Sequence, residues 1–315
     1  MRTDDDSWGI SDSVGSTAVM VAAVRAAESN SATPLINDRY ARMLVADEGS
    51  GVFSSILDGS LGDRIAAKDP AAAAIFSYMQ DYQAVRTHFF DAFCAEAAAA
   101  GIRQFVILAS GLDTRAYRLN WPQGTVVYEV DLAKVLSYKA SELATHGVQP
   151  LATVREVAAD LRDDWPILLE EQGFEPSQPT AWLAEGLLMY LPGTEQDELC
   201  ELITQSSGAG SRVAAEFIPY RDDERAEQIR ELFTHLADEL GVEHIVFGFV
   251  ADMEGLTYRD PDRADLTGWL QAHGWGASSL PVTDEMDRLG FAGDVSMRHG
   301  ADSFAYFVVG ELTQP

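Results

Sequence analysis

Hydrophobic and polar positions along the chain follow two different patterns, which meet near residue 101. Before it, apolar residues recur at helical spacing in GSTAVMVAAVRAAES, in LINDRYARMLV and in a long stretch from Phe76 to Ala100 that ends at Gly101, a good helix stop. No strand-like alternation is evident in this part. We therefore expect residues 1–100 to form an N-terminal helical cap.

From Arg103 onward, short apolar runs alternate with amphipathic stretches. The runs are, in order, QFVILA, GTVVYEVD, ATVREVAADL, TAWLAEGLLMYL and SRVAAEFI. Between the fourth and fifth runs, Leu199, Leu202 and Ile203 share the spacing of one helix face. Strand-like runs separated by helices predict βαβ units, which form a parallel sheet covered by helices on both faces. We expect residues 101–315 to form this α/β domain.

The pattern loosens after Pro219. DDERAEQIRELFTHLADELG predicts a helix, followed by a less regular stretch, and we interpret residues 219–262 as an insertion after the fifth strand. Farther on, DLTGWLQAHGW predicts a helix and DSFAYFVVGEL, rich in aromatic and β-branched residues, predicts a terminal strand. The insertion and the N-terminal helices would form a lid over the strand ends, where the substrate would be recognised.

Composition narrows the classes of partner. The chain has 315 residues, of which 47% are hydrophobic, so it can bury a sizeable core. Its 50 acidic and 22 basic residues give a formal net charge of -28, which would repel nucleic acid and an anionic membrane surface. Cys94 and Cys200 alone provide neither a disulfide framework nor a zinc ligand set. An acidic beginning, MRTDDDSW, and the absence of an apolar stretch of about 20 residues favour a cytoplasmic location.

The predicted strand ends carry the candidate chemistry. Ligands of open parallel sheets bind outside the carboxyl ends of the strands. The first run ends in ASGLDTR, which contains Gly111, and the next three end at Asp131, Asp160 and Glu185. Asp131 follows Gly111 by 20 residues, the spacing at which a second-strand carboxylate binds ribose hydroxyls in nucleoside-binding folds. Alternatively, Asp131 caps the helix that follows it.

The turn after the first strand discriminates between cofactors. NAD and FAD sites use three glycines in the pattern G-x-G-x-x-G to hold a pyrophosphate, whereas this turn, A-S-G-L-D-T, has one. A pyrophosphate ligand is therefore disfavoured. A nucleoside that carries an amino-acid tail and no phosphate needs fewer glycines and more acids, and S-adenosylmethionine has that shape.

Several ordered motifs together resemble a known family. They are SVGSTAVMVAAVRAAES, YQAVRTHFFD, ASGLDTRAYRL, YEVDLAKVLSYK, VAADLRDDW and AEGLLMYLP. They resemble the actinobacterial, chiefly mycobacterial, S-adenosylmethionine-dependent methyltransferases of the leucine carboxyl methyltransferase-like superfamily, over nearly the whole chain. The resemblance implies a class I methyltransferase, Rossmann-like fold: a mostly parallel sheet of seven strands with helices on both faces, an N-terminal helical lid and an insertion after the fifth strand.

The resemblance also implies which residues contact the nucleoside of the cofactor. Asp131 would bind the ribose, and Asp160 and Leu161 would contact the adenine. An aspartate can accept from the exocyclic amine, and a backbone N–H at the next residue can donate to a ring nitrogen. The alternative for Asp160 is to cap a helix that starts near Asp163.

At the methionine end, the resemblance implies three further residues. Gly111 would lie under the methionine portion, Arg86 would pair with its carboxylate, and Glu185 would face its amino group or sulfonium side. Arg86 could instead be an exposed helix arginine, whereas Glu185 lies between apolar residues and needs a partner. Relatives often carry Gly-Ala-Gly at the first turn, but this chain has Ala109-Ser110-Gly111, which would tighten the turn or weaken cofactor affinity.

The expected activity is S-adenosylmethionine-dependent O-methylation of a carboxylate or hydroxyl on a small molecule. A carboxylate acceptor is ionised at pH 7 and needs no base. No histidine lies at a predicted strand end with an acid partner, so a histidine base is not supported, and no metal is expected. Tyr190 is a candidate substrate contact, with a packed core tyrosine as the alternative. The rival functions are a catalytically silent S-adenosylmethionine-binding regulator and an NAD-dependent oxidoreductase.

Overall fold

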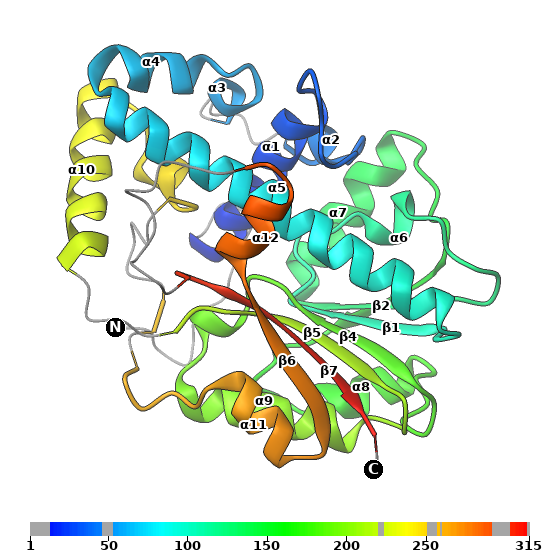
Figure 1. Ribbon diagram of the computed structural model, residues 1–315. Helices are drawn as coiled ribbons and strands as arrows, with labels where there is room; N and C mark the ends of the chain where they lie inside the picture. The colour runs from blue at the N-terminus through cyan, green and yellow to red at the C-terminus, as the bar shows by residue number, and fades with distance from the viewer. Residues whose placement is uncertain are drawn as a thin grey trace.

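A seven-stranded β-sheet forms the centre of the molecule (Figure 1). The computed structural model describes residues 13–45, 53–219, 224–250, 257–258, 260–291 and 303–313. The strand order is β3-β2-β1-β4-β5-β7-β6, with β1 to β5 parallel and β7 antiparallel to both of its neighbours. The strands are β1 Gln104–Leu108, β2 Val126–Asp131, β3 Thr153–Ala158, β4 Thr180–Ala184, β5 Arg212–Phe217, β6 Trp275–Pro281 and β7 Tyr306–Leu312.

This sheet, the helices on its two faces and the N-terminal helices confirm the predicted fold class. The helices in chain order are α1 Ser13–Ser29, α2 Ala41–Val45, α3 Ser54–Leu57, α4 Ser60–Lys68, α5 Pro70–Ala99, α6 Arg115–Arg118, α7 Ala133–Thr145, α8 Trp165–Glu171, η1 Leu188–Tyr190, α9 Gly193–Gln205, α10 Glu224–Leu240, η2 His244–Phe247, α11 Leu266–Ala272 and α12 Val282–Arg288. Among the described residues, none of these helices is both long and apolar enough to cross a membrane.

Alternate residues of each central strand enter two separate cores. In β1, Phe105 and Ile107 pack on the side of α1 and α5, whereas Val106 and Leu108 pack on the side of α8, α9 and α11. Successive side chains of a strand point to opposite faces, so a strand covered on both faces is apolar throughout. This explains why QFVIL and TAWLA are buried at every position.

The long helix α5 starts earlier than the sequence pattern indicates. Asp69 caps it by accepting the N–H groups of Ala71 and Ala72, and Pro70 fills its first position. The alanines that follow have the highest helix propensity of any residue, so they extend the helix without an amphipathic pattern. The helix ends before Gly101, as predicted.

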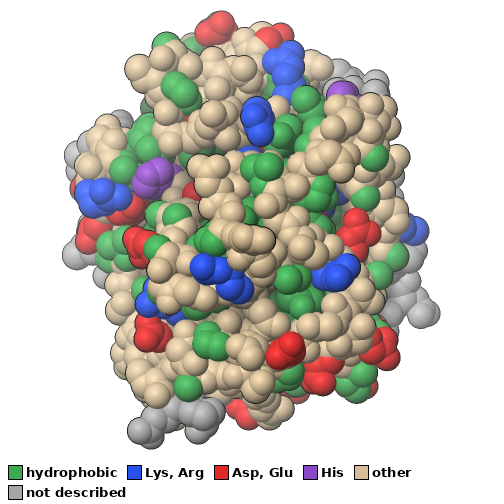
Figure 2. Space-filling view, turned by 90° about the vertical axis from the view of Figure 1, so that its right-hand side faces the viewer, with side chains coloured by type: hydrophobic (Ala, Val, Ile, Leu, Met, Phe, Trp, Pro, Cys, Tyr) green, Lys and Arg blue, Asp and Glu red, His purple; other side chains and the backbone are tan. Residues whose placement is uncertain are grey.

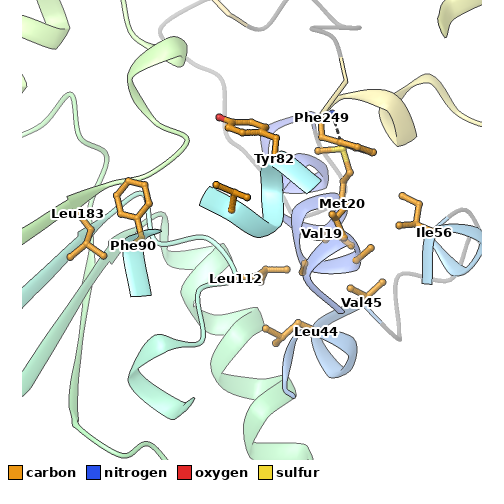
Figure 3. Packing of buried hydrophobic residues seen from close by; sticks show 14 of the residues in the cluster. Val19, Met20, Leu44, Val45, Ile56, Tyr82, Phe90, Leu112, Leu183 and Phe249 are labelled. Carbon is orange, nitrogen blue, oxygen red and sulfur yellow. Dashed lines mark hydrogen bonds between the residues drawn. The ribbon is translucent and has the colours of Figure 1, made fainter. Parts of the chain in front are cut away.

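Figure 3 shows how the N-terminal helices and the segment after β5 pack together. Val19 and Met20 of α1 belong to one buried cluster with Leu44 of α2, Ile56 of α3 and Phe249. The Phe249 N–H points at the Met20 sulfur, 3.1 Å away. The expected insertion, 219–262, lies partly outside the described residues, and the domain boundary at residue 100 stays a prediction.

The segment after α11 differs from the sequence-based expectation. The helix predicted over DLTGWLQAHGW ends at Ala272, and Trp275 already belongs to β6. Gly274, with φ +88°, makes the turn between them. The pattern gave no position for β6, because WGASSLP is small and largely polar; it is an edge strand that pairs with β7 alone.

Candidate functional site

The candidate site lies along the carboxyl edge of strands β3, β2, β1 and β4. Asp160, Asp131, Gly111 and Glu185 follow or end these four strands. Because the strands are parallel and adjacent in that order, the four positions follow one another along a single edge of the sheet. From β1 the chain adds strands first on one side, β2 and β3, and then on the other, β4 and β5. Open α/β sheets bind ligands at such a switch point, here between β1 and β4.

Asp131 ties the end of β2 to the turn after β1. Its Oδ2 accepts the Gly111 N–H at 2.6 Å and its Oδ1 accepts the Leu132 N–H at 2.7 Å. Helix α7 has Leu132 at its N-cap position and no side-chain cap, so Asp131 is not the helix cap that the alternative predicted. Burial raises the pKa of Asp131, while the two N–H bonds act in the opposite direction. A carboxylate has about four lone-pair sites, so acceptor capacity remains for a ligand hydroxyl.

The turn itself has an unusual backbone. Ala109 and Gly111 both have φ +49°, and Ala109 is the one non-glycine residue with positive φ in the described chain. A non-glycine residue in this conformation costs roughly 1–2 kcal/mol, so Ala109 is a strained position in the turn. A Cβ built on Gly111 would lie 3.4 Å from the Ala18 Cβ, so α1 packs directly against the turn. The buried Ser110 hydroxyl has no hydrogen-bond partner among the described residues.

Arg86 of α5 lies between two carboxylates. Only 7% of the residue is exposed, so the alternative of an exposed helix arginine is wrong. Its Nε lies 3.0 Å from Glu185 Oε1 and its Nη1 lies 2.9 Å from Glu216 Oε2. Glu216 Oε2 also accepts the Gly186 N–H at 2.9 Å. Burial lowers the pKa of Arg86, and the Glu185 carboxylate opposes that change. Glu185 thus has the partner that its position required.

The second oxygen of Glu185 leads into a buried ion-pair network. Glu185 Oε2 lies 2.8 Å from Arg115 Nη1, and Arg115 also pairs with Asp91, at 2.8 Å, and with Asp113. Arg118 pairs with Asp91 at 2.5 Å. The carboxylates around Arg115 raise its pKa despite burial. Helix α5, the turn after β1 and the end of β4 are therefore held together by charge.

The same network continues into α1. Arg25 lies 3.0 Å from Asp38 and donates to the Leu112 carbonyl at 2.6 Å, and Arg118 lies 3.7 Å from Asp38. Leu112 belongs to the turn after β1 and lies beside α1 in Figure 3. The N-terminal helices are thereby attached to the turn that carries Gly111.

Asp160 and Leu161 lie at the β3 end of the edge. Asp160 accepts from Arg162 through the backbone N–H at 3.0 Å and through the guanidinium at 3.0 and 2.6 Å. Helix α8 starts at Trp165 with Asp164 at its N-cap, so Asp160 is not the cap of that helix. Leu161 lines a groove of about 800 Å³ between the loop before α8 and α9, with Leu191 and Glu195 on its other side.

Tyr190 lies in η1, close enough to Arg86 for its phenol to affect the pKa of the guanidinium. Its role as a substrate contact stays a prediction. His88 is half-buried on α5, with a buried Nδ1 that has no hydrogen-bond partner in the described segments. His299 lies outside the described residues.

Sequence reasoning missed Glu216, Arg115 and Asp91. Glu216 interrupts the apolar run SRVAAEFI in the way that Glu185 interrupts TAWLAEGLL, and this signal could have identified it. Asp91 and Arg115 carry no comparable signal, because a charged residue on a helix usually faces water. Only their position in the fold brings them to the Arg86 cluster.

Comparisons with known proteins identify relatives. The model of the leucine carboxyl methyltransferase family matches residues 18–204, more than half of the chain. Similar solved structures include the following three. A candidate methyltransferase from Thermobifida fusca YX has 15% identity and a TM-score of 0.48, over 95% of this chain and 94% of that one. A carbon methyltransferase has 10% identity and a TM-score of 0.44, over 96% of this chain and 93% of that one. Magnesium protoporphyrin IX methyltransferase from Synechocystis PCC 6803, with bound SAH, has 13% identity and a TM-score of 0.43, over 74% of this chain and 85% of that one. The chain belongs to the leucine carboxyl methyltransferase family.

Proposed function

We propose that the protein is an S-adenosylmethionine-dependent methyltransferase that methylates an oxygen, in a carboxylate or a hydroxyl, of a small molecule. The observation that carries the proposal is the order of groups along the sheet edge. From β3 to β4, these are Asp160, Asp131, Gly111 and then Glu185 with Arg86. Adenine, ribose, sulfur and amino-acid tail follow one another in the same order in the methyl donor.

The donor set fits this molecule. Arg86 offers a buried guanidinium to the carboxylate of the tail, and Glu185 offers a carboxylate to its amino group. The buried Ser110 hydroxyl, which lacks a partner among the described residues, lies in the turn beside Gly111. The donor contains no pyrophosphate, so its site does not need the three-glycine motif that holds one.

The donor, when bound, supplies a methyl group on a positively charged sulfur. The sulfur would leave as a neutral thioether, so it needs no acid. The tasks left to the chain are to align the acceptor and to exclude water. Asp131 would hold the ribose, and Arg86 with Glu185 would hold the tail. Helix α1, which packs on Leu112, would cover the turn. A carboxylate acceptor is already ionised, so this proposal requires no base, and Tyr190 would contact the acceptor.

A catalytically silent cofactor-binding regulator is the second candidate. The strained backbone of Ala109, the one non-glycine residue with positive φ in the described chain, favours it, because such a turn could bind the cofactor differently. An NAD-dependent oxidoreductase is disfavoured by the missing glycines. Binding of the methyl donor separates the oxidoreductase from the other two, and turnover separates the enzyme from the regulator. The acceptor is a small molecule in this proposal, and the protein acts in the cytoplasm.

Calorimetric titration tests the cofactor assignment, with S-adenosylmethionine, S-adenosylhomocysteine and NAD as ligands. We expect the two sulfur nucleosides to bind, NAD not to bind, and Asp131→Ala to weaken nucleoside binding. Loss of hydrogen bonds to a charged group costs about 1.5–3 kcal/mol, which corresponds to roughly 10- to 150-fold in affinity.

Asp69→Ala is the matched control, because Asp69 also accepts two backbone N–H groups but caps α5. It should bind both nucleosides like the wild type. Equal affinities of wild type and Asp131→Ala would contradict the ribose assignment, and absence of binding by both nucleosides would contradict the proposed function.

A further inference from the structure

Glu216, at the end of β5, is a fully buried carboxyl group with two differently placed oxygens. Oε2 accepts the Gly186 N–H and lies 2.9 Å from Arg86 Nη1. Oε1 is buried and has no hydrogen-bond partner within the described part of the chain. An ionised carboxylate normally has both oxygens solvated or paired, so this arrangement suits a carboxyl that can hold a proton on Oε1.

Charge around Arg86 is already fully matched. Its guanidinium has a carboxylate on each side, Glu185 and Glu216. In the wider buried network, the described residues include four arginines and five carboxylates, namely Arg25, Arg86, Arg115, Arg118, Asp38, Asp91, Asp113, Glu185 and Glu216. A ligand carboxylate at Arg86 would join a site that already has one acid more than it has bases. The amino group of the same tail would lie at Glu185, so the ligand charge placed at the partner of Glu216 is the negative one.

We propose that Glu216 takes up a proton when a carboxylate-bearing ligand binds to Arg86, so that ligand binding and protonation of Glu216 are coupled. The inference rests on the proposed function, in which the tail of the methyl donor is that ligand. The proton comes from the solvent and resides on Oε1, and no other bond forms or breaks. Glu216 keeps its contacts with Arg86 and Gly186 through Oε2, while the ligand competes with Glu185 for the guanidinium.

The surroundings of Glu216 support this coupling. Burial raises the pKa of its carboxyl to about 8, although the Gly186 N–H and the Arg86 ion pair favour the charged form. The charged and titratable groups that face it are Arg86 on α5, Glu185 after β4 and, through Arg86, Tyr190 of η1. On the other side, β7 places Phe307 opposite it. Another anion at Arg86 would raise the pKa further, so the ligand-bound protein holds the proton to a higher pH.

The direction of the pH dependence follows from the higher pKa of Glu216 in the ligand-bound protein than in the free protein. Below about pH 7, Glu216 is already protonated, and binding takes up almost no proton. Above pH 8, binding requires protonation, so uptake approaches one proton and the Kd rises by up to roughly tenfold per pH unit. Glu216→Gln mimics the protonated side chain, because its amide oxygen can still accept from Gly186 and Arg86. This variant should bind like the wild type near pH 6.5 and more tightly than the wild type near pH 9.

The experiment is calorimetric titration with S-adenosylhomocysteine between pH 6.5 and 9.5, in pairs of buffers that differ in ionisation enthalpy. The wild type should show proton uptake that rises through pH 8, and Glu216→Gln should show none beyond the ligand's own titration. Glu311→Gln is the matched control, because Glu311 pairs with Arg212 at 3.0 Å at the opposite end of β5. This control should behave like the wild type. Ligand binding with equal uptake in wild type and Glu216→Gln would overturn the inference and leave the proposed function intact.

A measurement without ligand tests the protonation of Glu216 independently of the proposed function. Infrared spectra of the free protein should contain a protonated-carboxyl band at pH 6.5 that decreases as the pH rises through about 8, and Glu216→Gln should lack it. Its absence from the wild type would show that Glu216 is ionised throughout, which would overturn the inference. Uniformly weaker binding by Glu216→Gln at every pH would also overturn it, because that result indicates only a structural role.

Discussion

Gly186 connects the end of β4 to the Arg86 cluster through its backbone alone. Its φ is +63°, a left-handed conformation that side chains with a Cβ disfavour. Its N–H donates to Glu216, and a Cβ built on it would lie 3.3 Å from Arg86 Nη1. The conformation favours glycine, and the guanidinium would have to move by a few tenths of an ångström to admit a Cβ.

We expect Gly186→Ala to impair both stability and ligand binding. The left-handed backbone should cost about 1–2 kcal/mol of unfolding free energy. The methyl group should also displace Arg86 and weaken S-adenosylhomocysteine binding several-fold. Gly124→Ala is the matched control, since Gly124 has φ +84° and no atom within 4 Å of its Cβ position. Urea unfolding and calorimetry would measure the two effects. A similar loss of affinity in both variants would mean that strain, and not the contact with Arg86, controls binding.

Sequence position identified the acids that end apolar runs, but it could not identify their partners. Asp131 and Glu185 were predictable because a carboxylate at the end of a buried strand needs a function or a partner. Arg115 belongs to the quoted turn ASGLDTRAYRL, yet nothing in the sequence indicates that it bridges Glu185 and Asp91. Such long-range pairs depend on how α5 crosses the sheet, and local periodicity does not contain that information.

Helix α5 carries Arg86 and Asp91, and Asp69 caps its first turn, far from both residues. Asp69 accepts the Ala71 and Ala72 N–H groups at 2.8 and 3.0 Å. We expect Asp69→Ala to lower the free energy of unfolding by about 1 kcal/mol, the usual loss for an N-cap aspartate. Asp164→Ala is the comparison, because Asp164 occupies the N-cap of α8 without a side-chain hydrogen bond. Urea unfolding should show little change for that variant, and equal losses in both would contradict the capping explanation.

Elements buried on both faces were the most predictable. The five parallel strands lie within the five apolar runs. Burial on both faces explains the runs of β1 and β4, which are buried at every position, whereas β3 is an edge strand and is largely exposed. Strand β6 was not predictable, because its small and polar residues show no strand pattern. Its extended conformation depends on backbone pairing with β7. The first turns of α5 were not predictable for a related reason: alanines carry propensity without a periodic pattern.

Charge is distributed differently inside and outside the molecule. Arginines nearly balance carboxylates in the buried network of the described residues, so little of the net charge of -28 arises there. On the face shown in Figure 2, acidic and basic side chains are scattered and do not form one patch of a single sign. The excess of 50 acidic over 22 basic residues acts as a repulsion that destabilises the compact state.

We expect added sodium chloride to stabilise the protein. The screening length falls from about 30 Å at 0.01 M salt to about 8 Å at 0.15 M, which weakens repulsion between surface acids far more than it weakens buried ion pairs. The midpoint of thermal unfolding should therefore rise over this range. Replacing the exposed Glu170 and Glu171 of α8 by lysine would make the net charge less negative by four units and should reduce the rise. A midpoint that falls with salt would mean that attractive ion pairs outweigh the repulsion, despite the excess of acids.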